Sequence, residues 1–393
     1  MARWMLPDGI EELLPARARV MENLRRALLD HFSCYGYDLV MPPFLEYLDS
    51  LMIGTGQDLE SQTFRVTDPL TGKLMGLRAD MTLQAARIDA HQIQHDDPVR
   101  LCYIGTVLRS HPDGFAGSRA PLQVGAELYG HAGIESDLEI LELMLDTLQL
   151  TGIEDIHIDL GHVGIYRGLV RQAGLSAQAE QELFAALQRK ALPEIRQLLS
   201  DWQIDPGVES MLAILADLNG GEETLARARE SLRAAESSVH NALDDLERIA
   251  QQLKLRRPGL PVHFDLAELR GYAYQTGMVF AAFVPGYGQE IARGGRYDEI
   301  GSIFGRARPA TGFSADLKTL IRLSRHLPSA ELSGAIYAPA EQDAALLEKV
   351  RQLRSQGERV IMALPGQSGG VREMGCDREL VRKGKQWQLV SVS

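Results

Sequence analysis

The sequence predicts an α+β fold in which an antiparallel sheet is flanked by helices, carries a helical insertion and is followed by a small C-terminal α/β unit. Three observations predict it. Strand-like segments lie on both sides of residues 163–257, a stretch that reads almost entirely as helix. Residues 328–334 (PSAELSG) resemble a linker, and a β-α-β pattern follows them. The chain of 393 residues is too long for one ordinary core, so we expect domains at 1–327 and 328–393.

An N-terminal helix is the first element in chain order. Apolar residues recur at three-to-four spacing from Val20 to Phe32, which predicts an amphipathic helix over residues 15–34 that Gly36 ends. The extended segment 38–47 follows it. Two adjacent prolines in that segment cannot donate hydrogen bonds to a sheet, so this strand should end at an edge or an interface.

The remaining elements follow from the same patterns of hydrophobicity and turn residues. They are a hairpin at 62–78, a short helix at 82–90, strands at 100–110 and 120–131, an acidic helix at 136–152, and strands at 262–269, 272–284 and 288–295. Ser136 suits the N-cap of the acidic helix. In the C-terminal unit, strands at 334–340 and 359–366 enclose a helix at 340–356.

Composition excludes several classes of protein. The formal net charge of −12 disfavours a broad nucleic-acid surface, because phosphate binding needs clustered positive charge. The three cysteines form no CxxC pair, so neither a zinc site nor a disulfide framework is expected. No apolar run approaches the ~18 residues of a membrane span. We expect a soluble, cytoplasmic protein without a metal or cofactor.

Three polar residues suggest a small binding site. Gln123 and Glu127 are four residues apart on one expected strand, so they point to the same face. Arg109, which we expect at the end of the neighbouring strand, could complete a pocket with both charge signs. Such a pocket suits an amino acid, whose ammonium and carboxylate groups need opposite partners. A strand with polar residues on a solvated face would show the same pattern.

Four ordered motifs resemble those of class II aminoacyl-tRNA synthetases, and histidyl-tRNA synthetase in particular. They are Gly36-Tyr37…Pro42-Pro43…Glu46, Tyr103-Ile104-Gly105…Arg109…Gln123…Glu127, Leu269-Arg270-Gly271…Val279-Phe280, and Gly294-Gly295-Arg296-Tyr297-Asp298…Gly312-Phe313. The resemblance covers residues 5 to 325 approximately. It implies the class II synthetase-like fold and self-association into a dimer through the first motif, the helix at 16–34 and the strand through Pro42.

The departures from that family fall on its nucleotide contacts. Asp316 stands where the resemblance implies a glycine that admits the adenylate, and Thr319 stands where it implies an arginine that grips ATP phosphates. His111 and Pro121 replace an acid and an adenine-stacking aromatic residue. A carboxylate beside a triphosphate is repelled strongly in a poorly solvated site. The resemblance therefore implies a site that has lost its nucleotide.

The amino-acid half of the site is better kept. The resemblance implies that histidine is bound by Asp80, Thr82, Arg109, Gln123, Glu127, Arg270 and Tyr274. Arg270 stands at the position that contacts the histidine carboxylate. Ala273 and Gln275 replace an aspartate and a tyrosine of the family, which puts tight selectivity for imidazole in doubt. Alternatively, these residues persist only as buried polar structure.

A synthetase-like core without nucleotide contacts, and with too few residues for a full anticodon-binding domain, resembles the regulatory subunits of ATP phosphoribosyltransferase. That resemblance implies no catalytic residues, no tRNA binding and no membrane association. It implies a short catalytic subunit as partner in a hetero-octamer, and histidine as the feedback effector. The alternatives are another synthetase-derived amino-acid-binding module, an amino-acid ligase acting on a protein, or an active histidyl-tRNA synthetase.

Overall fold

The computed structural model describes residues 5–52, 57–112, 117–269, 271–272, 274–325 and 334–392. The chain divides into two units, Met1–Pro328 and Ser329–Ser393. The first unit contains a large sheet flanked by helices and the second a small sheet with one helix, so the α+β class is confirmed. None of the helices in the described ranges combines the length and the apolar character that crossing a membrane would need.

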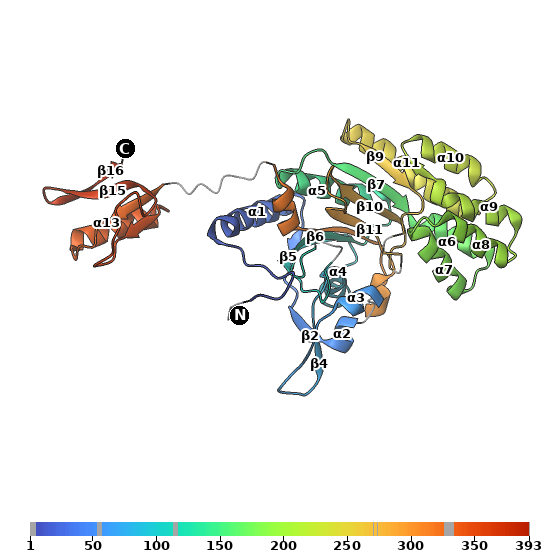
Figure 1. Cartoon of the computed structure of the whole chain (residues 1–393), viewed down its shortest axis with the longest axis horizontal. Coiled ribbons are helices and arrows are strands. Elements are labelled where there is room, and N and C mark those ends of the chain that lie inside the picture. The colour runs from blue at the N-terminus through green and yellow to red at the C-terminus, as the bar shows by residue number, and fades with distance from the viewer. Residues whose placement is uncertain are drawn as a thin grey trace. The chain divides into compact units, whose positions relative to one another are not determined.

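A nine-stranded sheet organises the described part of the first unit, in the order β1-β5-β6-β12-β11-β10-β7-β9-β8 (Figure 1). The strands are β1 (Asp38–Leu39), β5 (Val99–Thr106), β6 (Leu122–Tyr129), β7 (His157–His162), β8 (Asn219–Gly220), β9 (Val262–Asp265), β10 (Met278–Phe283), β11 (Ala292–Arg296) and β12 (Ala310–Asp316). Pairing is antiparallel from β5 through to β7, as expected, but β1–β5 and β7–β9 are parallel. β1 ends the sheet, which confirms the edge position that the prolines predict.

One face of this sheet forms the hydrophobic core. Val124, Ala126 and Phe313 point to that face and are buried against helices α1 (Pro15–Cys34) and α5 (Ile134–Leu150). Alternate residues of the same strands point to the opposite face. That second face carries Gln123 and Glu127, so the strand pattern separates the core from the candidate site.

Helices lie against both faces of the nine-stranded sheet. Outside the helical insertion, the first unit contains α1 (Pro15–Cys34), α2 (Leu48–Met52), α3 (Gln57–Gln62), α4 (Thr82–Ile88), which continues as a π-helix at Asp89–Ile93, α5 (Ile134–Leu150), a 3₁₀ helix at Ile300–Phe304, and α12 (Leu317–Leu323). The amphipathic helix at 15–34 is confirmed, and the predicted apolar stripe from Val20 to Phe32 is buried. The Ser136 cap is wrong: Gly133 is the N-cap of α5, and the Ser136 hydroxyl donates within the first turn to the Gly133 carbonyl at 2.8 Å.

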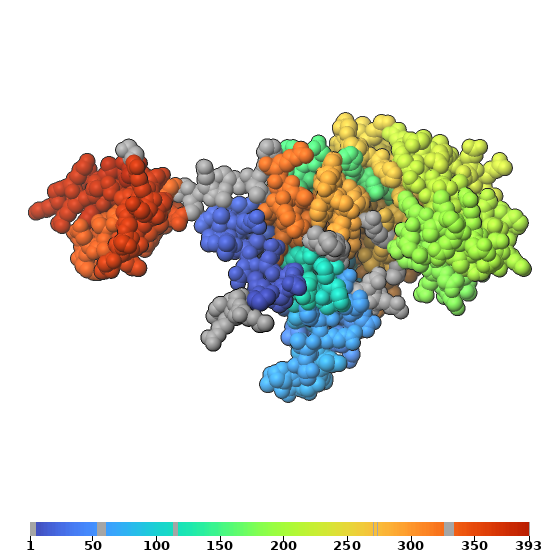
Figure 2. Space-filling view, in the orientation of Figure 1, coloured from blue at the N-terminus to red at the C-terminus, as the bar shows by residue number. Residues whose placement is uncertain are grey.

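The helical insertion is confirmed. It consists of α6 (Val163–Ala173), α7 (Ala177–Gln188), α8 (Leu192–Asp201), α9 (Pro206–Ile214), a 3₁₀ helix at Leu215–Asp217, α10 (Glu223–Ser231) and α11 (Ser237–Arg256). These helices form the yellow-green lobe beside the sheet (Figure 2). Within the insertion only the short strand β8 extends the sheet.

A small three-stranded sheet, in the order β2-β4-β3, projects from the first unit (Figure 1). Its strands are β2 (Leu45–Tyr47), β3 (Arg65–Thr67) and β4 (Leu74–Leu77). The predicted hairpin at 62–78 is therefore confirmed. Several apolar side chains of this sheet and of the chain leading to it are exposed.

The second unit contains one more hairpin than the sequence analysis predicts. Its sheet has the order β14-β13-β15-β16, with β13 (Ala335–Ala338), β14 (Val360–Met362), β15 (Cys376–Lys383), β16 (Gln386–Ser391) and one helix, α13 (Ala344–Ser355). The β-α-β order of β13, α13 and β14 is confirmed. The β15–β16 hairpin turns at Gly384, which has a positive φ of 64°.

Candidate functional site

Strand register decides which side chains meet on the sheet face opposite the core. Glu127 on β6 lies opposite Gly312 on β12, and Gly312 lies opposite Gly295 on β11. Gln123 points to the same face as Glu127, because residues four apart on a strand do so. A Cβ atom at Gly312 would lie 1.6 Å from Oε2 of Glu127, so glycine at this position leaves the space that the carboxyl group occupies.

Glu127 is the centre of a buried hydrogen-bond network. It is 1% exposed, which excludes the reading of this strand face as simply solvated. The Tyr103 hydroxyl donates to Oε1 of Glu127 at 2.7 Å, and the Tyr297 hydroxyl donates to Oε2. The Thr82 hydroxyl lies 3.1 Å from the Tyr103 hydroxyl. One tyrosine therefore connects two of the predicted site residues.

Gln123 and Asp80 extend the polar cluster. The side-chain amide of Gln123 donates to Oδ2 of Asp80 at 2.9 Å, and its oxygen accepts from the backbone N–H of Met81 at 3.0 Å. Oδ1 of Asp80 accepts from the backbone N–H of Thr82 at 2.6 Å. Four predicted residues, Asp80, Thr82, Gln123 and Glu127, are thus brought together at the start of α4 and on β6.

The other three predicted residues differ in their placement. β5 ends at Thr106, so Arg109 lies in the following loop rather than on the strand, where its Nε donates to the Ala79 carbonyl at 3.3 Å. Tyr274 is 42% exposed as a whole residue. Burial of its hydroxyl raises the pKa of that group; the Arg293 charge opposes the shift, and the charges of Asp80 and Glu127 add to it. Arg270 lies outside the described residues.

The sequence analysis did not assign Tyr103, Tyr297 and Gln275 to the site. Both tyrosines lie inside the quoted motifs, and the strand register places their hydroxyls on Glu127. Gln275 is 6% exposed, and among the described residues its Oε1 atom has no hydrogen-bond partner. That oxygen points at Gly295, whose Cβ would lie 2.6 Å away. We interpreted Gln275, in place of a tyrosine, as a loss of selectivity. Its oxygen instead provides an available hydrogen-bond acceptor in the row of the sheet that contains Gly295, Gly312 and Glu127.

Burial changes the acid–base behaviour of Glu127. It raises the pKa of the carboxyl group to about 8, although hydrogen bonds from Tyr297 and Tyr103 oppose the shift. The neutral form is therefore the main form of Glu127 near neutral pH when no cation is beside it. A cationic group placed beside it would favour the ionised form.

Glu127→Gln should change how stability depends on pH. The carboxyl group has a folded-state pKa of about 8 and an ordinary value of 4.5, so its stabilising contribution is complete below the lower value and is lost as the pH rises through the upper one. The loss is about 1.4 kcal/mol per pH unit between those values. We expect the wild type to lose Tm relative to the variant from about pH 5.5 to about pH 7.5. Parallel pH profiles of Tm would contradict the raised pKa.

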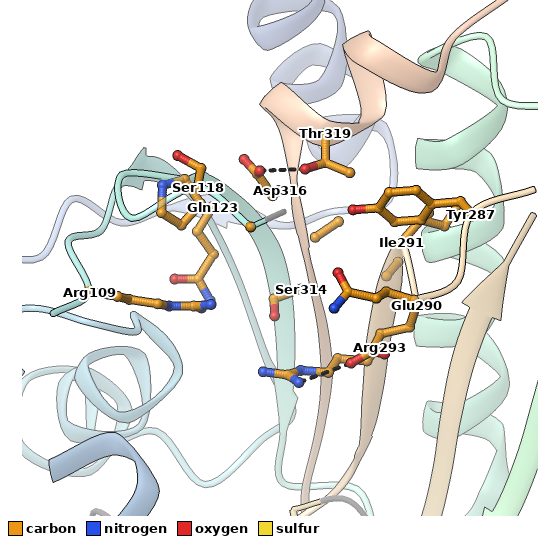
Figure 3. Close-up of a pocket in the computed structure, with 15 residues that line it drawn as sticks. Arg109, Ser118, Gln123, Tyr287, Glu290, Ile291, Arg293, Ser314, Asp316 and Thr319 are labelled. Carbon is orange, nitrogen blue, oxygen red and sulfur yellow. Dashed lines mark hydrogen bonds and ion pairs between the residues drawn. The ribbon is translucent and has the colours of Figure 1, made fainter. Parts of the chain in front are cut away.

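A cavity of about 320 Å³ adjoins this network (Figure 3). Arg109 and Gln123 line one side, Tyr287 and Arg293 line the other, and Asp316 lies at one end. Its lining includes Pro121, Asp316 and Thr319, three positions at which the resemblance implies nucleotide contacts. Of the predicted site residues in the described ranges, Arg109 and Gln123 contribute to its lining.

The Asp316 carboxylate is bound by the protein itself. Oδ1 accepts from the backbone N–H groups of Leu122 and Lys318 at 3.0 and 3.1 Å, and Oδ2 accepts from the Thr319 hydroxyl at 2.7 Å. An internal anion thus caps α12 and joins it to β6. A phosphate group at this place would meet a negative charge that already holds the local donors.

Comparisons with known proteins agree with this architecture. Residues 9–320 match the family model of histidyl-tRNA synthetase, and residues 333–390 match the model of the ATP phosphoribosyltransferase subunit HisZ C-terminal domain. The solved structure of an ATP phosphoribosyltransferase regulatory subunit/histidyl-tRNA synthetase from Bacillus halodurans has a TM-score of 0.82 at 25% identity, covering 95% of this chain and 96% of that chain. Histidyl-tRNA synthetase from Nostoc shares the fold, with a TM-score of 0.77 at 19% identity over 97% and 92% of the two chains.

Curated relatives match nearly the full length of this chain, and two of them serve as examples. The ATP phosphoribosyltransferase regulatory subunit of Thioalkalivibrio sulfidiphilus is 56% identical over 391 residues, 99% of each chain. That of Methylococcus capsulatus is 56% identical over 392 residues, 100% of this chain and 97% of the relative. The fold is thus that of the class II synthetase-like proteins related to histidyl-tRNA synthetase, as the four motifs predict. The chain belongs to the family of ATP phosphoribosyltransferase regulatory subunits, and the predicted regulatory role in histidine biosynthesis is confirmed at the level of that family.

Proposed function

We propose that this chain has no catalytic activity of its own, that a short catalytic ATP phosphoribosyltransferase subunit requires it, and that it carries histidine feedback inhibition. Histidine binds among the predicted residues, Asp80, Thr82, Arg109, Gln123, Glu127, Arg270 and Tyr274. Carboxylates receive the ammonium group, guanidinium groups receive the carboxylate, and Glu127 with the Gln275 amide receives the imidazole. The proposed location of this activity is the cytoplasm.

The contrast between two neighbouring sites carries the proposal. The Glu127 network keeps a buried acid that accepts from two tyrosine hydroxyls. The unpartnered Gln275 amide oxygen lies beside Gly295, in the same row of the sheet. The adjoining nucleotide position instead has the Asp316 carboxylate bonded to three donors of the same chain. A site that retains amino-acid contacts without nucleotide contacts suits a sensor rather than a synthetase.

Purified protein should therefore show no ATP–pyrophosphate exchange with histidine. An arginine on the phosphates is replaced by Thr319, and the Asp316 carboxylate repels a triphosphate. Exchange is measured with radiolabelled pyrophosphate at saturating histidine and magnesium ATP, with an active histidyl-tRNA synthetase as the positive control. Exchange above the enzyme-free background would contradict the proposal and favour a working synthetase.

The proposed assembly is a hetero-octamer built on self-dimers of this chain. The resemblance implies a two-fold interface at the helix at 16–34 and the strand through Pro42. Apolar residues around β1, β2 and β3 are exposed in this region; they are Leu39, Met41, Phe44, Leu45, Tyr47 and Val66. We infer that residues 1–327 and 328–393 are separate domains, in line with the two compact units. Co-purification of the chain from its native source tests the partner: recovery without an ATP phosphoribosyltransferase catalytic subunit would favour an unrelated amino-acid-binding module.

A further inference from the structure

Arg293 stands at a position on the sheet face that no part of the proposed site uses. On β11 it lies opposite Ser314 of β12, which lies opposite Gly125 of β6. Gly125 is midway between Gln123 and Glu127, about 6.8 Å from each along the strand. The three rows share one face of the sheet, so Arg293 belongs to the face that carries the Glu127 network.

One small residue, Ser314, separates the Arg293 side chain from the Glu127 network on that face. Two strand spacings, about 9.6 Å, separate β11 from β6. β12 lies between them and carries only Ser314 in this row. On β6 the space over Gly125 is filled by the Tyr103 hydroxyl, which would lie 2.6 Å from a Cβ atom there. In Figure 3 the Arg293 side chain extends past Ser314, toward the side of the cavity that holds Gln123 and Arg109. A long cationic side chain is thus directed toward the amino-acid side of the cavity.

Glu290 is the internal anion beside this cation. Nη1 of Arg293 donates to Oε1 of Glu290 at 3.2 Å, and both residues line the cavity. In this ion pair the Arg293 side chain is 47% exposed and the Glu290 side chain is 22% exposed, so water screens part of their attraction. A ligand carboxylate would offer Arg293 the same charge and the same acceptor geometry as Glu290.

We propose that Arg293 binds the carboxylate of the histidine effector, and that Glu290 is the internal competitor that this carboxylate displaces. The proposal rests on the proposed histidine site. With the imidazole at Glu127, the other end of the ligand points along the face toward Gln123 and the cavity. The guanidinium group can form two parallel hydrogen bonds with a carboxylate, a geometry that selects for this group. Because Glu290 precedes β11 in the connection from β10, its displacement also releases a cavity-lining segment that includes Tyr287.

The test compares histidine with histamine, which has the imidazole and ammonium groups but no carboxylate. Binding is measured by calorimetry on the full-length chain reconstituted with its catalytic subunit. Arg293→Gln should weaken histidine binding about tenfold while histamine binding changes about twofold or less. Glu290→Gln should strengthen histidine binding by about threefold and leave histamine unchanged, because it removes a competing carboxylate. Arg248→Gln, which removes another exposed i,i+3 ion pair, is the matched control and should change neither ligand.

The outcomes separate this inference from the function on which it rests. Equal weakening of both ligands by Arg293→Gln would show a structural role, and an unchanged histidine affinity would place the carboxylate at Arg109 or Arg270; either result overturns the inference alone. If Arg293→Gln fails to fold, Glu290→Gln tests the inference on its own. Unchanged or weaker histidine binding by Glu290→Gln would contradict competition between Glu290 and the histidine carboxylate for Arg293. Failure of the wild-type complex to bind histidine would overturn the proposed function itself.

Discussion

Glu127→Gln is expected to weaken histidine binding by tenfold or more and to shift the histidine inhibition curve of the reconstituted complex by a similar factor. The substitution keeps the shape of the side chain and removes its ability to become an anion. Loss of a charged hydrogen-bond partner costs about 1.5–3 kcal/mol, which corresponds to roughly a tenfold to hundredfold change in affinity. The measurement is calorimetric titration with histidine, followed by inhibition assays of the complex.

A matched control tests whether removal of any carboxylate would have the same effect on histidine binding. Glu135→Gln removes a carboxylate whose side chain is 65% exposed and which does not contact the Glu127 network; it should leave the histidine affinity unchanged. Unaltered inhibition in both Glu127→Gln and Arg270→Ala would contradict the proposed site. The network would then be a structural remnant, and the sensor would lie elsewhere, for example at a subunit interface.

Local patterns were sufficient to predict most of the fold. The helix at 15–34 has a continuous apolar stripe, and all of its stripe residues are buried. The spacing of Gln123 and Glu127 placed both on one face without knowledge of the neighbouring strands. Ser136 shows where such reasoning fails: several residues near the start of α5 suit a cap, and the backbone geometry selects Gly133.

The site itself depends on contacts between distant segments, which a single sequence does not specify. Tyr297 reaches Glu127 only because β12 lies between β6 and β11, and that strand order follows from the whole topology. The role of Asp316 likewise depends on a backbone N–H of β6, at Leu122. Gln275 illustrates a different limit. The sequence shows that glutamine replaces a tyrosine of the family, but only the structure shows that the glutamine oxygen lies beside Gly295 without a hydrogen-bond partner among the described residues.

Met41→Asp is expected to convert the self-dimer into monomers. Met41 is 78% exposed in the isolated chain and follows β1, in the region that motif 1 assigns to the two-fold interface. An aspartate there is solvated in the monomer, so folding should be unaffected, but in a dimer each copy would bury an unpaired charge at a cost of about 3–5 kcal/mol. Two neighbouring positions are less suitable: Val40 packs against the buried clusters, and the Phe44 ring lies 5.5 Å from the Arg78 guanidinium, which could pair with a new aspartate.

Sedimentation at micromolar concentration provides the measurement, with Leu389→Asp as the control. Leu389 is 39% exposed on β16 of the second unit, so its substitution also adds a charge at an exposed apolar position, but outside the motif 1 region. We expect wild type and Leu389→Asp to sediment as dimers and Met41→Asp to sediment as a folded monomer, whose Tm lacks only the contribution of dimerisation. A monomeric wild type would contradict a self-dimer, whereas a dimeric Met41→Asp variant would move the interface away from β1. Because the proposed hetero-octamer is built on this dimer, loss of assembly in Met41→Asp should also abolish stimulation of the catalytic subunit, even though every residue of the proposed histidine site is unchanged.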